Sequence, residues 1–220
     1  MNSAVNKVQD RSVTTVENLY GAPSSLAEQL GEMGIGVPWD KVAQYLKSPE
    51  ISNAQDLANF LNTYHAHILS TVEFPCILQA WKHTQKGETR ELIALDNQLG
   101  LEPRNELLAR ASQLVGRQHL RRLRPLLDHR VVQRYLAAVD SGKATGWHPI
   151  VFGMTLAVYS LPPRQGLLRY GEEILYCLAD AVVYSRRLPQ SAFRKSYDSA
   201  VNNLPETIDR SLVMPEFRVI

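Results

Sequence analysis

Hydrophobic residues recur every three or four positions along most of the chain, which is the spacing of one buried helix face. No run of alternating apolar and polar residues indicates a strand. We therefore predict an all-α protein, a single-domain orthogonal bundle of about eight to ten helices. The predicted helices span approximately residues 25–33, 38–46, 53–70, 77–85, 88–98, 103–124, 128–139, 150–159, 165–185 and 189–204.

The segment 146–158 is apolar on almost every face. It begins with Trp-His-Pro at 147–149, and proline is compatible with a first helical turn, where its missing N–H needs no partner. The residues that follow carry no charge, so this helix must be covered on all sides. Gly153 costs such a helix about 1 kcal/mol relative to alanine, which suggests the close approach of another backbone. We expect the rest of the chain to wrap around this buried central helix.

Prolines and small polar residues set the expected helix ends. Pro75 disfavours the helical conformation of the residue before it, so we expect a break or kink around residues 70–75. Asp128 is a good N-cap for the helix that follows it, and a final helix is expected from Pro189 to about Leu204. The domain organisation is then a mobile tail over 1–15, one helical domain over 16–213 and a C-terminal tail over 214–220.

The composition is that of an ordinary soluble domain, with 45% hydrophobic and 21% charged residues in 220 and a formal net charge of +2. The charge is unevenly distributed, with a net of −5 over residues 1–102 and +7 over 103–220, which suits charge-steered assembly. The first 20 residues have no apolar signal core, and no uncharged run approaches the roughly 18 residues of a membrane span. Cys76 and Cys177 lie in apolar surroundings and are read as reduced thiols. We expect a cytoplasmic protein with no membrane partner.

Motifs for catalysis or metal binding are missing. His65 and His67 would point to different sides of a helix, and a proline separates His119 from His129. A nickel role for His148 is conceivable, with a hydrogen-bonded structural histidine as the alternative. Nucleophile elbows and phosphate-binding glycine loops are absent from the sequence. The chain is therefore predicted to be a binding protein rather than an enzyme, with no cofactor.

The stretch Arg117–Arg134 holds six arginines against one acid, Asp128. Three readings remain open: a nucleic-acid backbone site, a surface for an acidic protein, or a plain solvated face. Only Tyr135 lies beside the arginines, so nothing offers a stacking surface for bases, and we do not expect a nucleic-acid partner.

Three segments together resemble the urease accessory protein F family. Trp-His-Pro-Ile-Val-Phe-Gly at 147–153 is similar to the family's His-x-Pro-Val-Val-Phe-Gly segment. Leu95-Asp96 followed by Ala-Ser-Gln-Leu-Val-Gly-Arg at 111–117 is similar to a second motif. Tyr170 followed by Arg-Leu-Pro at 187–189 resembles the family's tail, and order and spacing agree over most of the chain.

Three elements depart from the family pattern. In the middle motif, the family's Glu and Arg before Ala-Ser become Leu107 and Ala109. The N-terminal Gly-Gly-Phe is replaced by Leu-Tyr-Gly at 19–21, and the Leu-Gly-Gln after the tail proline becomes Gln-Ser-Ala at 190–192. Family members are thought to meet their partners through these N-terminal and tail elements. A divergent all-helical interaction paralogue, no longer tied to urease, is therefore the alternative, and a helical enzyme whose site converges only in space is a third.

The resemblance implies a non-enzymatic protein that forms a homodimer. It would bind urease accessory protein D (called H in some organisms) and recruit the accessory GTPase, protein G. The assembly would deliver nickel to apo-urease. Because the GTPase supplies the nucleotide chemistry, the resemblance implies no catalytic residue, metal ligand or cofactor in this chain.

The tail motif, carried over residue by residue, implies a partner surface at Arg186, Arg187 and Pro189, together with Tyr170, for which a core position is the alternative. Arg187 could form charge-assisted bonds to a carboxylate of a partner, or be a simple exposed helix-end arginine. The remaining motif residues are expected to be structural: His148, Pro149, Gly153, Ser112 and Gly116.

Overall fold

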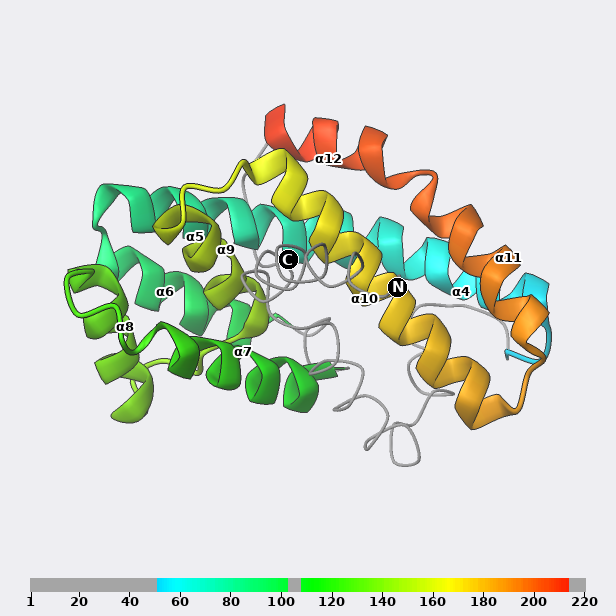
Figure 1. The fold of residues 1–220 in the computed structure, drawn as a ribbon, viewed down its shortest axis with the longest axis horizontal. Coiled ribbons are helices and arrows are strands. Elements are labelled where there is room, and N and C mark those ends of the chain that lie inside the picture. Colours follow the sequence, from blue (N-terminus) through cyan, green and yellow to red (C-terminus); the bar gives the residue numbers. More distant parts are fainter. Residues whose placement is uncertain (1–50, 103–107, 214–220) are drawn as a thin grey trace, which may run out of the picture.

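The fold is taken from a computed structural model, which describes residues 51–102 and 108–213. These residues contain helices and no strand, which confirms the all-α prediction. The expected helices before residue 51 and both tails lie outside the described residues, so the total number of helices stays a prediction. The elements, shown in Figure 1, are α4 (Ala54–Tyr64), π-helix η1 (His65–Glu73), α5 (Phe74–Lys86), α6 (Thr89–Gly100), α7 (Ala109–Leu123), α8 (Arg130–Asp140), α9 (His148–Val158), α10 (Pro163–Arg186), α11 (Gln190–Val201) and α12 (Leu204–Val213).

The first described helical run continues without interruption through α4, η1 and α5. Its N-cap is Asn53, whose side-chain oxygen accepts the N–H groups of Gln55 and Asp56. Of the expected break or kink near Pro75, the break is absent, because the chain passes into π-helical geometry before the proline, with the Phe74 N–H bonded to the Leu69 carbonyl. The kink stays a prediction. The wider π turn moves the preceding carbonyls away from the proline ring, which would clash with the carbonyl four residues earlier in an α-helix.

Two other helix ends differ from the prediction. Helix α8 begins at Arg130 with His129 at the N-cap, so Asp128 does not cap it. The chain after Pro189 forms two helices instead of one, because α11 ends at Val201 and α12 begins at Leu204. The side chain of Leu204 is fully buried, and this anchors the start of the additional helix.

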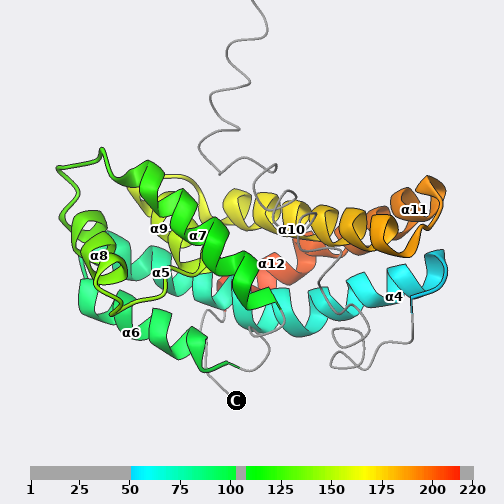
Figure 2. The same ribbon diagram turned by 90° about the horizontal axis from the view of Figure 1, so that it is seen from below.

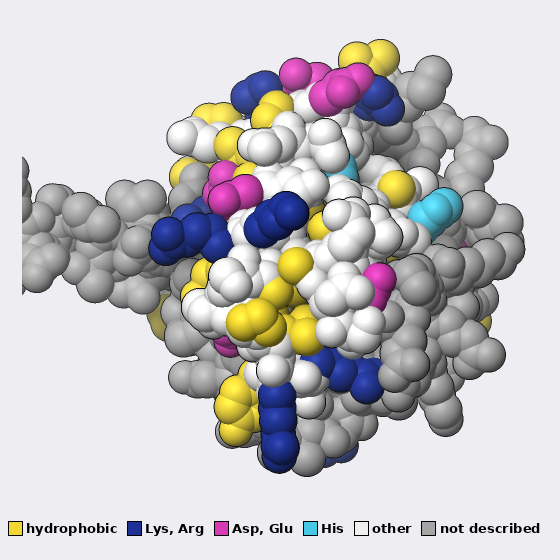
Figure 3. Space-filling model, turned by 90° about the vertical axis from the view of Figure 1, so that its right-hand side faces the viewer, with side chains coloured by type: hydrophobic (Ala, Val, Ile, Leu, Met, Phe, Trp, Pro, Cys, Tyr) yellow, Lys and Arg dark blue, Asp and Glu magenta, His cyan; other side chains and the backbone are white. Residues whose placement is uncertain are grey.

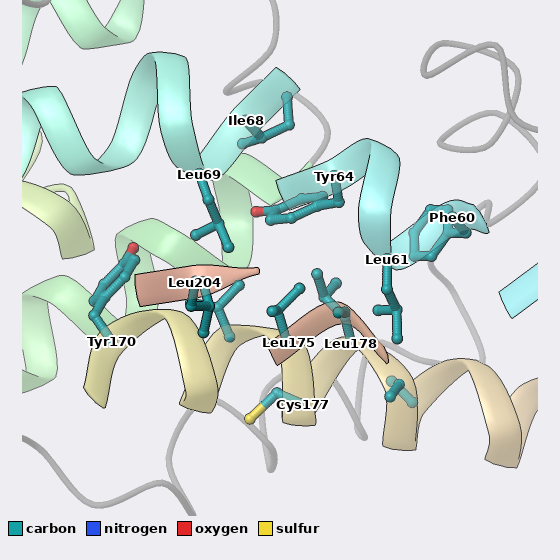
Figure 4. Packing of buried hydrophobic residues seen from close by; sticks show 14 of the residues in the cluster. Phe60, Leu61, Tyr64, Ile68, Leu69, Tyr170, Leu175, Cys177, Leu178 and Leu204 are labelled. Carbon is teal, nitrogen blue, oxygen red and sulfur yellow. The ribbon is translucent and has the colours of Figure 1, made fainter. Parts of the chain in front are cut away.

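Two hydrophobic cores lie side by side along the molecule. One packs α4, η1, α10, α11 and α12 together with parts of α5 and α7. Figure 4 shows Leu61, Tyr64, Leu69, Leu175 and Leu178 of this core facing one another. The other lies among α5, α6, α7, α8 and α9. Figures 1 and 2 show the corresponding halves of the elongated bundle.

Helix α9 belongs to both cores, as η1, α5 and α7 also do. Its Phe152 and Leu156 enter the first core, whereas Ile150, Val151 and Met154 enter the second. Helix α9 packs mainly on α5 and α7, while α4, α11 and α12 pack chiefly on one another, on η1 and on α10. A bundle wrapped around α9 as its central helix is therefore not confirmed; α9 is a buried helix shared by two cores.

The close approach that Gly153 suggested is present between α5 and α9. A Cβ atom at Gly153 would lie 2.4 Å from the carbonyl oxygen of Ile77 and 2.9 Å from the Cβ of Ala80. One of these atoms is backbone, so it cannot move aside without shifting a helix. The contact between the two helices therefore requires glycine at this position.

We predict that Gly153→Ala destabilises the protein by about 2 kcal/mol or more, because an added methyl group forces α5 and α9 apart. The free energy of unfolding from urea denaturation measures the loss. Gly100→Ala is the matched control, since a Cβ there would lie 3.6 Å from the Trp147 ring, an ordinary contact. Equal stability of Gly153→Ala and wild type would contradict the close packing.

Candidate functional site

The segment that leads into α9 is held by one buried carboxylate, Asp96 of α6, which is fully buried. The carboxylate accepts the backbone N–H groups of Thr145 (2.5 Å), Gly146 (3.0 Å) and Trp147 (3.3 Å). It also accepts the hydroxyl of Tyr135 at 2.5 Å, and the Trp147 indole donates to the Asp96 carbonyl at 3.1 Å. A buried carboxylate is tolerated when donors satisfy its lone pairs. Asp96 therefore fixes where α9 begins.

Helix α7 closes the same junction from the other side. A Cβ at Gly116 would lie 2.1 Å from the carbonyl oxygen of Gly146 and 2.6 Å from the nitrogen of His148. The Ser112 hydroxyl accepts the His148 N–H at 3.3 Å, and Pro149 lies in the first turn of α9. The five motif residues expected to be structural thus lie in the packing of α9 against α7 and α5.

His148 is an enclosed, neutral imidazole. Its ring centroid lies 5.2 Å from that of Tyr170 and 6.1 Å from that of Phe152. Burial, with a smaller effect from His119, lowers the pKa of His148 to about 3. Within the described residues, no three His, Cys, Asp or Glu side chains come together as metal ligands, and the nickel role considered for His148 stays a hypothesis.

A small cavity adjoins His148 inside the first core. Its volume is about 20 Å³, enough for about one water molecule, and its polar lining comes from Tyr64, Glu73, Ser112, His148 and Tyr170. The Tyr64 hydroxyl donates to Oε1 of Glu73 at 3.1 Å. Burial raises the pKa of Glu73 to about 7, against the lowering effect of hydrogen bonds from the two tyrosines. This cavity is too small for an organic substrate.

The two cysteine thiols are also enclosed. Both Cys76 and Cys177 are buried, and neither forms a disulfide. Burial raises the pKa of Cys177 to about 12 and that of Cys76 well above its usual value, so both are protonated at neutral pH. A protonated thiol is a poor nucleophile.

We predict that Glu73→Gln changes how stability depends on pH. The folded-state pKa lies above the ordinary value of 4.5, so the wild type loses stability as pH rises through about 7. Relative to wild type, Glu73→Gln should gain up to about 3 kcal/mol in free energy of unfolding between pH 4.5 and 8. Urea denaturation across this range measures the difference. Glu91→Gln on the exposed face of α6 is the matched control, and parallel curves for Glu73→Gln and wild type would contradict the prediction.

The predicted partner residues do not all come together. Arg187 is exposed at the C-terminus of α10, and Pro189 is the exposed N-cap of α11, so both lie at the α10–α11 corner (residues 184–190) with the partly buried Arg186. Tyr170 is 2% exposed and lies 17 residues earlier on the same helix, about 25 Å away along its axis. Tyr170 takes the core position that was the alternative for it, packed against His148 and Phe152.

Arg187 has an unusual backbone conformation. Its φ of 54° is in the left-handed region, and its N–H closes the last turn of α10 on the carbonyl of Tyr184. Glycine usually occupies this position, since a side chain there is strained. The conformation ends α10 and turns the chain into α11, with the Arg187 side chain in solvent.

A groove beside the α10–α11 corner was not foreseen. On α10, Tyr176 is 46% exposed and Tyr184 is 70% exposed. The Tyr176 ring packs edge-on against Phe193 and Tyr197, and Figure 3 shows hydrophobic side chains gathered among basic ones at this end. The groove has a volume of about 780 Å³ and is lined by Tyr176, Gln190, Ser191, Phe193, Arg194, Lys195 and Asp198. The position of Tyr176 off the apolar stripe of α10 is the sequence signal for it.

Comparisons with known proteins match the chain to one family. The UreF family model matches residues 51–194, which include the Asp96 junction and most of the groove. A similar relative, the "Urease accessory protein UreF" of Sporosarcina pasteurii, is 21% identical over 173 residues, covering 77% of this chain and 84% of the relative. In the described part of the chain, every helix is too short or too polar to cross a membrane.

Proposed function

This chain belongs to the UreF family of urease accessory proteins, and we propose that it acts as a non-enzymatic scaffold for urease maturation. With accessory protein D/H and the accessory GTPase G, it would promote nickel insertion into apo-urease. In this role the chain forms a homodimer and contributes surfaces, while the GTPase contributes nucleotide chemistry. A cytoplasmic location is part of the same proposal.

The observation that carries the proposal is the contrast between a rigid, enclosed interior and an exposed corner rich in interface residue types. The α10–α11 corner presents Arg187 and Tyr184 in solvent, and the half-exposed Tyr176 lines the groove. Tyrosine and arginine dominate the binding energy of protein interfaces, because each combines a large contact area with directional hydrogen bonds. We therefore assign the GTPase-binding surface to the corner and its groove.

The left-handed backbone at Arg187 supports a specific contact. The surrounding helices hold this residue at a fixed turn, so its guanidinium is presented without ordering a loop. Such preorganisation reduces the entropy lost on binding. A carboxylate of the GTPase is the proposed partner group, since guanidinium and carboxylate form paired, charge-assisted hydrogen bonds. By binding one GTPase conformation more tightly than another, the scaffold would raise the population of the conformation that it binds.

We predict that deleting the gene lowers urease activity when nickel is limiting, because the apo-enzyme then fills slowly. Urease activity per unit of urease protein, together with urease-bound nickel, measures the defect. Restoring the gene on a plasmid is the control. Full urease activity in the deletion strain would contradict the maturation role.

We predict that Arg187→Ala lowers recovery of the GTPase in pull-down assays by about tenfold, the effect of losing one charge-assisted contact. The fold should be unchanged, because alanine and arginine both carry a Cβ and are similarly strained at this φ. Circular dichroism and thermal unfolding check this. Arg90→Ala on the exposed face of α6 is the matched control, and unchanged recovery with Arg187→Ala would remove Arg187 from the surface.

A second candidate function rests on the groove itself. Gln190 and Ser191 line it, and these are residues at which the chain departs from the family's tail pattern. A changed lining favours an interaction paralogue that kept the fold and exchanged its partner. Failure to copurify with the D/H and G accessory proteins, by a chain with native circular dichroism, would favour this alternative.

A further inference from the structure

The solvent-facing side of α7 carries a row of exposed arginines. Arg110, Leu114, Arg117, Arg121 and Arg124 follow one another at spacings of three or four, and all five are exposed. At about 100° per residue they lie within roughly 80° around the helix axis and extend over about 21 Å. We call these five residues the arginine stripe. The opposite side of α7 packs against α9.

The stripe does not have the composition of an ordinary solvated helix face. Helix Ala109–Leu123 contains no Asp or Glu, so it has no internal opposite-charge pair. Arg117 and Arg121 are like charges four residues apart, and Arg110 lies in the first turn, where the helix dipole disfavours a cation. This arrangement destabilises the isolated helix. A helix face exposed only to water would not require such an unfavourable placement of charges.

Two of the arginines are positioned by contacts, whereas the other two form no ion pair with a described residue. The Nε of Arg117 donates to the Thr145 carbonyl at 2.8 Å, and Arg124 contacts Asp140 at 3.1 Å, with more than half of each of these two side chains exposed. Among the described residues, none forms an ion pair with Arg110 or Arg121. Their guanidinium groups are therefore available to a ligand.

We propose that the arginine stripe binds an acidic helix of a partner protein, with carboxylates at three- or four-residue spacing around one apolar side chain. Leu114, 43% exposed, lies between Arg110 and Arg117 and would meet the apolar side chain. An apolar centre bordered by charged groups is the usual anatomy of a protein interface. Arginine, rather than lysine, suits paired hydrogen bonds to carboxylates.

A nucleic acid fits the stripe less well. Phosphate groups would satisfy the arginines, yet Leu114 would then face a charged backbone. The stripe also has no aromatic side chain on which a base could stack. The proposal does not depend on the urease role or on the α10–α11 corner, so either can fail without the other.

The test uses the full chain and a fluorescein-labelled, alanine-based 18-residue peptide with glutamates at three- and four-residue spacing around one leucine. Fluorescence anisotropy at low salt should show binding, and a peptide with glutamine in place of glutamate should bind at least tenfold more weakly. The double variant Arg110→Glu, Arg121→Glu should lower affinity for the glutamate peptide at least tenfold. Leu114→Ser should lower it several-fold without changing the salt dependence.

The matched control is the double variant Lys82→Glu, Lys86→Glu on α5, which makes the same charge change at exposed positions on another helix. It should bind the peptide within twofold of wild type. An equal loss in this control would show attraction to net charge alone and overturn the proposal.

Three further outcomes also overturn the proposal. One is tighter binding of a labelled 20-base DNA strand than of the peptide, with the same dependence on Arg110 and Arg121. Another is a wild-type dimer in sedimentation equilibrium that the double variant converts to monomer, since the stripe would then bind a second copy. The third is equal peptide binding by wild type and Arg110→Gln, Arg121→Gln, the milder pair used if charge reversal prevents folding.

Discussion

The structure depends on a negative charge placed where water cannot reach it. The Asp96 carboxylate gathers three consecutive backbone N–H groups and the Tyr135 hydroxyl, and these bonds determine where α9 begins. A carboxylate left without such donors would be strongly unfavourable in this environment. The charge and the loop therefore stabilise each other, and the contacts of α9 with α5 and α7 follow from the position they set.

Periodicity identified most of the helices because each one buries a single face, and this signal is local. Whether a proline ends, interrupts or begins a helix was harder to predict, because this depends on the backbone geometry and packing of neighbouring residues. Pro75 lies in a continuous helix, since π turns precede it, and Pro205 lies in the first turn of a helix whose Leu204 is buried against other elements. Local preferences compete here with packing, which a single sequence does not display.

Some residues of the candidate site were predictable from local sequence, as most helices were, and others depended on tertiary packing. Glycines in tight contacts, such as Gly116 and Gly153, carry their own signal, since glycine is unfavourable in helices. The sequence also contains a signal for the burial of Asp96, because this residue lies on the same helix face as the apolar Leu92 and Leu99. The core position of Tyr170 and the groove at Tyr176 depend on which helices cover α10, and only the three-dimensional arrangement shows this.

Helix α9 has a thermodynamic consequence that follows from its membership in both cores. Unfolding either core removes an apolar covering from α9 and so exposes surface of the other, which ties the two halves into one cooperative unit. A ligand that binds only the folded protein at one end therefore raises the free energy of unfolding of the whole bundle. Ligand binding at one end of this elongated molecule therefore stabilises the other end against unfolding, without any change of conformation.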